Sequence, residues 1–226
     1  MARSVLFLLC IISFNISAQD VLRGEVRVII EPVYISDYAE DNRRLDRESL
    51  YHRALEETAF FYSAMIYGWA FDYEVGERAR GIAEDFSLTP VGEIPFGDPR
   101  LSVTDSKFED IRLYVWSDYR LSTDQQRRMK IWTSGTVRSA QATGRGALSG
   151  ADGESGWLDV KKAVLEDAAR AAVRTMLRGS ERNRPKEVKG FISLSSFPLY
   201  HIESGEWVVS ARFRVEIKEI IPFSVY

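Results

Sequence analysis

The side chains that most often carry acid–base or metal chemistry are few in this sequence. It contains 2 histidines, His52 and His201, and a single cysteine, Cys10. A zinc site needs three or four clustered ligands with supporting hydrogen bonds. No H-E-x-x-H motif, cysteine pair or aspartate-rich calcium loop occurs. We therefore predict no catalytic residue, no metal site and no cofactor, with both histidines at the surface or packed.

Two carboxylate pairs are adjacent in the sequence, Glu56-Glu57 and Glu84-Asp85. Neighbouring residues on a helix point apart, whereas acid–base work needs two carboxylates that face one substrate. We interpret both pairs as solvated.

A glycine-rich segment, 144–156, lies between a predicted strand and a predicted helix, where phosphate-binding loops occur. It has neither the G-x-x-x-x-G-K-[ST] nor the G-x-G-x-x-G spacing. We interpret it as a connector.

Aromatic residues mark a first candidate binding surface. A strand predicted over 108–121 places Tyr114 and Trp116 on one face. The apolar set lies on the other face: Ile111, Leu113, Val115 and Tyr119. Because the core takes the second set, we expect the two aromatic rings at an interface.

Arginines mark a second candidate surface. Arg170, Arg174 and Arg178 recur every fourth residue on a predicted helix and form a stripe. Such a stripe suits an acidic partner or lipid headgroups. Glu166 and Asp167 are interleaved, so the alternative is a solvated helix face.

The composition bounds the partners. The chain has 226 residues, is 45% hydrophobic and carries 30 basic against 33 acidic residues, a net charge of −3. This length and apolar content support one globular domain or two small ones. The charge balance gives no general attraction to nucleic acid, so we predict none as a partner.

The first 18 residues follow the pattern of a secretory signal. Arg3 precedes the apolar run Val5–Ile12, and Ala18 stands at the predicted cleavage site. An uncleaved anchor is the alternative, because Ile16 lies before the cut where a small residue is usual. Cys10 lies inside the run without the small residues of a lipoprotein signal. We predict an exported protein of the bacterial periplasm or envelope, with no integral membrane span in the mature chain.

Hydrophobic periodicity then divides the mature chain into two parts. Over 19–124 we predict a strand at 24–35, a helix between Asp46 and Gly68, and strands at 67–75 and 108–121. The residues between those last two strands, 76–107, carry several glycines and prolines and predict a long loop, with a short element around Ile82–Leu88 inside it.

Over 125–226 we predict a strand at 127–142, a helix at 158–178, and strands at 188–201 and 206–219. Both parts then have the order β-α-β-β. The predicted fold class is α+β, with mainly antiparallel sheet and one long helix in each unit. The sequence leaves open whether the units share one sheet.

The second part also resembles a known family. The resemblance rests on four segments: Lys130–Trp132, Gly144–Gly146, Ala163–Ala172 and Gly205–Arg212. Residues 130–220 resemble the small α/β domain of some bacterial envelope lipoproteins and of the N-terminal part of flagellar assembly protein T. The resemblance implies a non-catalytic scaffold of the envelope or flagellar motor. The missing lipobox before Cys10 departs from the lipoprotein members, so the resemblance does not extend to a lipid anchor.

Together these patterns predict a non-enzymatic, exported interaction module. Its partners would be envelope proteins or further copies of the chain, with peripheral membrane contact as an addition. The alternative is a ligand-binding or hydrolytic protein that acts on cell-wall material through residues 76–107 and His201.

Overall fold

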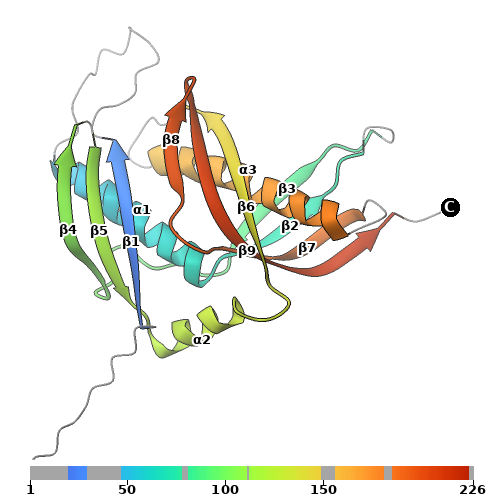
Figure 1. The fold of residues 1–226 in the computed structure, drawn as a ribbon, viewed down its shortest axis with the longest axis horizontal. Coiled ribbons are helices and arrows are strands. Elements are labelled where there is room, and N and C mark those ends of the chain that lie inside the picture. Colours follow the sequence, from blue (N-terminus) through green and yellow to red (C-terminus); the bar gives the residue numbers. More distant parts are fainter. Residues whose placement is uncertain are drawn as a thin grey trace, which may run out of the picture.

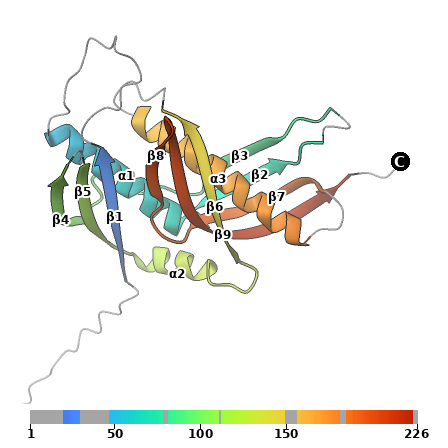
Figure 2. The same ribbon diagram turned by 45° about the horizontal axis from the view of Figure 1, so that its top comes forward.

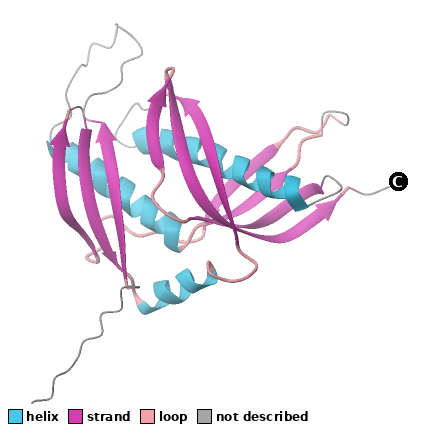
Figure 3. Cartoon of the chain, viewed as in Figure 1, coloured by secondary structure: helices cyan, strands magenta, loops and turns pink. Residues whose placement is uncertain are grey.

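The computed structural model describes residues 20–29, 47–77, 81–110, 112–148, 156–180 and 185–223. These residues form an α+β fold in which every strand pairing is antiparallel (Figures 1 and 3). The predicted fold class is therefore confirmed at this level.

The helices and strands follow one another in this order: β1 (Val21–Ile29), α1 (Arg47–Ile66), β2 (Trp69–Glu74), β3 (Asp85–Pro90), β4 (Leu101–Glu109), β5 (Arg112–Arg120), α2 (Thr123–Ile131), β6 (Arg138–Ala147), α3 (Gly156–Ser180), β7 (Pro185–Leu194), β8 (Leu199–Glu203) and β9 (Glu206–Pro222).

A small sheet has the strand order β1-β5-β4. Its central strand turns Leu113, Val115 and Tyr119 into the core, where all three are fully buried, and β1 adds Val26 and Val28. These side chains pack on α1, which ends where Gly68 adopts a φ of +66°. The predicted inner face of this strand is confirmed for every described residue.

A larger sheet, of order β3-β2-β7-β9-β6 with β8 also paired to β9, curls around α3. The helix contacts strands at both ends of this order, β3 and β6, and also contacts β9 (Figures 1 and 2). Its small residues Ala168, Ala169 and Ala172 are fully buried and permit this close approach. The apolar stripe predicted for this helix is confirmed.

Helix α1 lies between the two sheets, because one side of it contacts β1 and β5 and the other contacts β7. Phe197, in the link from β7 to β8, also joins the sheets. Its ring lies 5.2 Å from the Phe61 ring and 4.9 Å from the Tyr62 ring, centroid to centroid. The same ring fills the space beside Gly24 of β1, where an added Cβ would approach it to 2.4 Å.

The prediction that 76–107 is mainly loop is wrong, although the short element predicted around Ile82–Leu88 overlaps β3. This segment contains β3, which pairs with β2, and most of β4, which pairs with β5. The glycines and prolines mark its turns, but the strands between them are short or largely exposed, so they lack a strong apolar alternation.

The strand predicted over 127–142 is also wrong in its first half, because Thr123–Ile131 is helix α2. A capping box begins this helix: Ser122 accepts from the Gln125 amide, and the Gln125 side chain accepts from the Ser122 amide. The strand predicted over 188–201 is interrupted at 195–198 and forms β7 and β8.

The finer prediction of two matching β-α-β-β units is not confirmed. The first part of the chain contributes β1, β4 and β5 to the small sheet but β2 and β3 to the large one. The boundary at 124/125 therefore does not separate two sheets.

Several predictions lie outside the described residues: the signal at 1–18 with its cut after Ala18, Cys10, the strand beyond Ile29, the cap at Asp46 and the side chain of Ile111. Of the helices that are described, none combines the length and apolar character needed to cross a bilayer.

Candidate functional site

The outer face of the small sheet carries an aromatic pair. Tyr114 and Trp116 alternate with buried residues of β5, so both rings point away from α1 and are half-buried. Their ring centroids lie 6.1 Å apart and their planes meet at 17°. The structure thus places both predicted residues on one face, opposite the core.

Charged side chains surround this pair. We call the outer surface of the small sheet around Tyr114 and Trp116 the aromatic face. Across the β1 side, Arg27 lies opposite Tyr114 with its guanidinium 5.4 Å from the ring centroid. Glu25 lies opposite Trp116 and accepts from the Arg27 Nε at 2.7 Å. Lys107 of β4 lies opposite Tyr114 on the other side. An aromatic centre with a charged rim is the composition typical of protein interfaces.

The three predicted arginines of α3 do not form a free basic stripe. Arg170 pairs with Asp167, and Arg174 pairs with Glu84, whose carboxylate also accepts from the Tyr73 hydroxyl at 2.6 Å. Arg178 is exposed near the end of the helix. Since two of the three charges are compensated, a strong attraction to lipid headgroups is not built into this helix face. The arginines also lie on α3, which packs against the large sheet, whereas Tyr114 and Trp116 belong to the small sheet (Figure 1).

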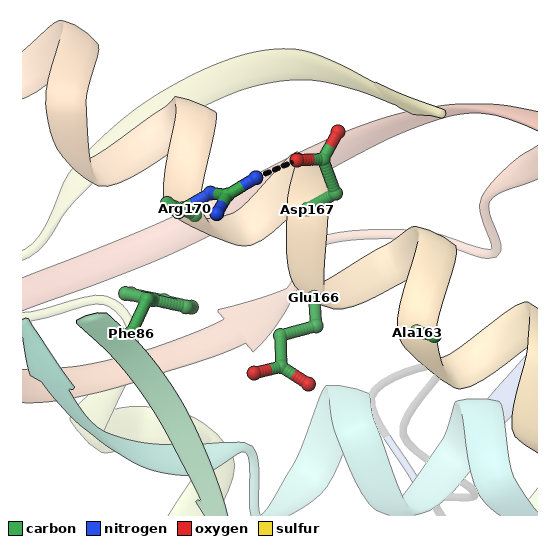
Figure 4. A pocket seen from close by; sticks show the side chains of 5 residues that line it. All are labelled: Phe86, Ala163, Glu166, Asp167 and Arg170. Carbon is green, nitrogen blue, oxygen red and sulfur yellow. Dashed lines mark hydrogen bonds and ion pairs between the residues drawn. The ribbon is translucent and has the colours of Figure 1, made fainter. Parts of the chain in front are cut away.

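A shallow pocket of about 140 Å³ lies between α3 and β3 (Figure 4). It is lined by Phe86, Ala163, Glu166, Asp167 and Arg170. Burial raises the pKa of Glu166, Arg170 opposes this rise, and Asp85 adds to it. Pockets for small organic ligands usually exceed about 300 Å³, so this one has room for only a few heavy atoms.

The histidines lie elsewhere. His52 of α1 is exposed and its ring lies 4.4 Å from the Phe96 ring, while His201 is exposed on β8. Neither lines the pocket. Across the described ranges, no three histidine, cysteine or carboxylate side chains gather where they could hold a metal ion.

The most unusual electrostatic feature was missed by the sequence analysis, which interpreted Glu57 as solvated. Glu57 of α1 is 2% exposed and Lys161 of α3 is 4% exposed. The Lys161 Nζ donates to both carboxylate oxygens, at 2.6 and 2.7 Å. Burial raises the pKa of Glu57, and the attraction of Lys161 opposes the rise.

Three rings enclose the same ammonium group. The Lys161 Nζ lies 5.6 Å from the Trp157 ring centroid, 5.1 Å from that of Tyr200 and 5.5 Å from that of Trp207. This arrangement stabilises a cation away from water. Helical spacing contained the signal: Glu57 lies on the stripe of Leu50, Ala54 and Phe61, and Lys161 on the stripe of Leu165 and Ala168.

A second buried network fixes the segments beside the small sheet. Asp98 accepts from the Arg100 backbone at 2.9 Å, from its guanidinium at 2.7 Å and from the Tyr119 hydroxyl at 3.1 Å. The side-chain amide of Gln125 in α2 donates to the hydroxyl groups of Tyr119 and Tyr67. The network joins the start of β4, the end of β5 and α2.

Comparison with other proteins covers both sheets. A protein-family model that carries no description of an activity matches residues 11–223. The chain belongs to that family. An uncharacterized protein of Treponema pallidum (strain Nichols) is 29% identical over 171 residues, which are 74% of this chain and 68% of that protein. No solved structure matches significantly. The family match therefore extends over the whole described fold, from β1 to β9.

Proposed function

We propose that this chain is an exported, non-enzymatic protein of the bacterial cell envelope that binds a protein partner through the aromatic face. The observation that carries this proposal is the pair Tyr114 and Trp116, half-buried on a sheet face whose other side is core. Two large rings held by a rigid central strand offer apolar contact area at a low entropic cost.

The surrounding charges support a protein partner. Arg23 and Asp118 approach within 3.6 Å at the edge of the aromatic face, and Arg27 pairs with Glu25. Both signs are present side by side, which favours a partner with its own mixed charges over a uniformly charged polymer or lipid surface.

The N-terminal sequence supports export, and the resemblance of residues 130–220 supports a place in an envelope assembly, including one of the flagellum or its motor. Export predicts that mature protein from the periplasm begins at Gln19. Mass spectrometry of the purified native protein measures this directly, and an intact N-terminus in the cytosolic fraction would contradict it.

The partner is tested by comparing variants. Tyr114→Ala/Trp116→Ala should weaken binding of a cross-linked and then purified partner at least about tenfold, since two central rings carry a large share of interface energy. Phe96→Ala is the matched control, because Phe96 is 54% exposed on another surface. Equal affinity of the double variant and the wild type would contradict the proposal.

A further inference from the structure

Strand β6 has one edge beside which no other described strand lies, and most of its hydrogen-bonding groups there point away from the described protein. β6 pairs with β9 in an unbroken register that sets Gln141 opposite Arg212. The Arg212 carbonyl accepts from the Ser195 backbone N–H, which lies on the side of β9 opposite β6. Gln141 and Arg212 are therefore a non-hydrogen-bonded pair, and the backbone N–H and C=O of Gln141 point away from β9. Alternation then directs the backbone groups of Ser139, Gln141 and Thr143 outward as well.

The next outward amide confirms this direction, because the Arg145 N–H donates to Asp167 Oδ2 of α3 at 3.0 Å. For Ser139, Gln141 and Thr143, the described part of the chain supplies no such partner. All three side chains are exposed.

The outer edges of β1, β3, β4 and β8 carry features that discourage pairing. β4 has a bulge between Val103 and Asp105, β3 is six residues long and ends at Pro90, and β8 is five residues long. β1 carries alternating charges: Arg23, Glu25 and Arg27. By contrast, β6 is ten residues long, has no bulge against β9, and carries no charge between Arg138 and Arg145.

The two ends of this edge have opposite charge. Near Arg145 lie three carboxylates: Asp167 at its amide and Glu203 and Glu206 at its guanidinium. They outnumber the two cations they meet, Arg145 and Arg170. The other end begins at exposed Arg138, and the nearby carboxylate of Glu216 is paired with Lys218 at 2.8 Å.

Arg178 adds to the basic end. It lies three helical turns after Asp167 on the same stripe of α3. The helix runs antiparallel to β6, because Gly146 faces Val164 and Gly144 faces Ala168. Arg178 is therefore placed toward the Arg138 end of the edge.

An edge that is basic at one end and acidic at the other is complementary to itself in the antiparallel direction. We infer that β6 pairs with β6 of a second copy of this chain about a twofold axis at Gln141. Ser139 then lies opposite Thr143 of the other copy, and the Arg138 end meets the carboxylates around the other copy's Arg145. Three residue pairs exchange main-chain hydrogen bonds. This surface is separate from the aromatic face, so it stands or falls independently of the proposed function.

Like charges across the axis provide the first test. Gln141→Lys and Gln141→Glu should each raise the dimer dissociation constant by about tenfold, measured by analytical ultracentrifugation of the full chain, because each variant opposes its own charge. Ser87→Lys is the control, since Ser87 is exposed on the edge strand β3 of the same sheet. Circular dichroism confirms that each variant folds.

A disulfide provides the second test. In a Cys10→Ser chain, Gln141→Cys should form a covalent dimer on mild oxidation, since facing hydrogen-bonded residues have Cα atoms about 5.5 Å apart. Ser87→Cys should not. A wild-type chain that is monomeric at high micromolar concentration overturns the inference. So does a dimer that resists both charged variants. If only one of the two charged variants weakens the dimer, β6 faces a charged segment other than β6 of the second copy, and the inference is overturned as well.

Discussion

Glu57 and Lys161 belong to the apolar stripes of two helices, and their burial requires that each neutralise the other. Removing both ions from water costs several kcal/mol per ion, and the attraction between them offsets this only while both are present. The rings of Trp157, Tyr200 and Trp207 supply further stabilisation of the ammonium group. The pair therefore contributes little net free energy to the contact between α1 and α3, but each side chain depends on the presence of the other.

This dependence predicts a non-additive result. Glu57→Leu and Lys161→Met should each lower the free energy of unfolding by about 3–5 kcal/mol, whereas the double variant should recover most of the loss. Urea denaturation measures all three.

The exposed pair Lys162–Asp159, at 3.1 Å, is the control. Lys162→Met should cost less than about 1 kcal/mol. If the losses of Glu57→Leu and Lys161→Met simply added in the double variant, the two side chains would not depend on each other.

Asp98 predicts a pH dependence. Hydrogen bonds from Arg100 lower the pKa of Asp98 to about 2, against the opposing effect of burial, with a further contribution from Tyr119. Because the folded pKa lies below the unfolded value of about 3.9, the ionised carboxylate stabilises the fold fully above pH ~4 and loses this effect as pH falls through about 2.

Asp98→Asn should therefore lower stability by about 1–2 kcal/mol at neutral pH, a value reduced for the partly exposed Arg100. The gap between the variant and the wild type should narrow as the pH falls from 4 to 2. Thermal unfolding across this range measures the gap, and a gap independent of pH would show that the charge of Asp98 has no role.

The contact between β6 and α3 depends on residues without side chains. At Gly144 an added Cβ would lie 2.2 Å from the Val164 carbonyl oxygen and 2.5 Å from the Ala168 amide nitrogen. Both are backbone atoms of a helix and have little room to move. The segment that resembled a glycine-rich connector is thus, in its first part, a strand that lets a helix approach closely.

Gly144→Ala should destabilise the protein by about 1–3 kcal/mol through this overpacking. Gly135→Ala is the matched control, because nothing lies within 4 Å of its added Cβ. Chemical denaturation of both variants decides the matter, and equal stability would mean that α3 shifts freely on the sheet.

Sequence periodicity predicted the elements that are long and have one apolar face. The stripes of α1 and α3, the alternation of β9 and the inner face of β5 were all visible before the structure. It failed for β3 and β4 because edge strands bury little, and for α2 because Met129 and Ile131 imitate the alternation of a strand. Local capping by Ser122 and Gln125 overrides that pattern.

The candidate site was predictable to the same extent. Tyr114 and Trp116 could be assigned to one face because strand geometry alone fixes it. The neutralisation of Arg174 could not, since Glu84 is 90 residues away in sequence and meets it only through the curl of the large sheet. The Glu57–Lys161 pair likewise depends on tertiary contact between residues separated by 104 positions.

The two sheets meet mainly through α1 and through Phe197, whose ring reaches β1 beside Gly24. Phe197→Ala should weaken the hold of the small sheet and lower its opening free energy by about 2–3 kcal/mol. Hydrogen exchange should then accelerate in β1 and β5 more than in β9.

Leu199→Ala, two residues later and 59% exposed, should leave exchange in every strand unchanged. Uniform acceleration in Phe197→Ala would instead indicate that both sheets open together.

The interleaving of the sheets along the chain also dictates an order of completion as the polypeptide is made or threaded from its N-terminus. All strands of the small sheet are present once residue 120 has emerged. The large sheet is completed much later, because α3 ends at residue 180 and β7, the neighbour of β2, ends at residue 194. During that interval the apolar surface of α1 that will contact β7 remains exposed to solvent. Exposed apolar surface of this kind is prone to aggregate, so we expect a chaperone that binds the nascent chain to raise its folding yield until residues 156–194 are available.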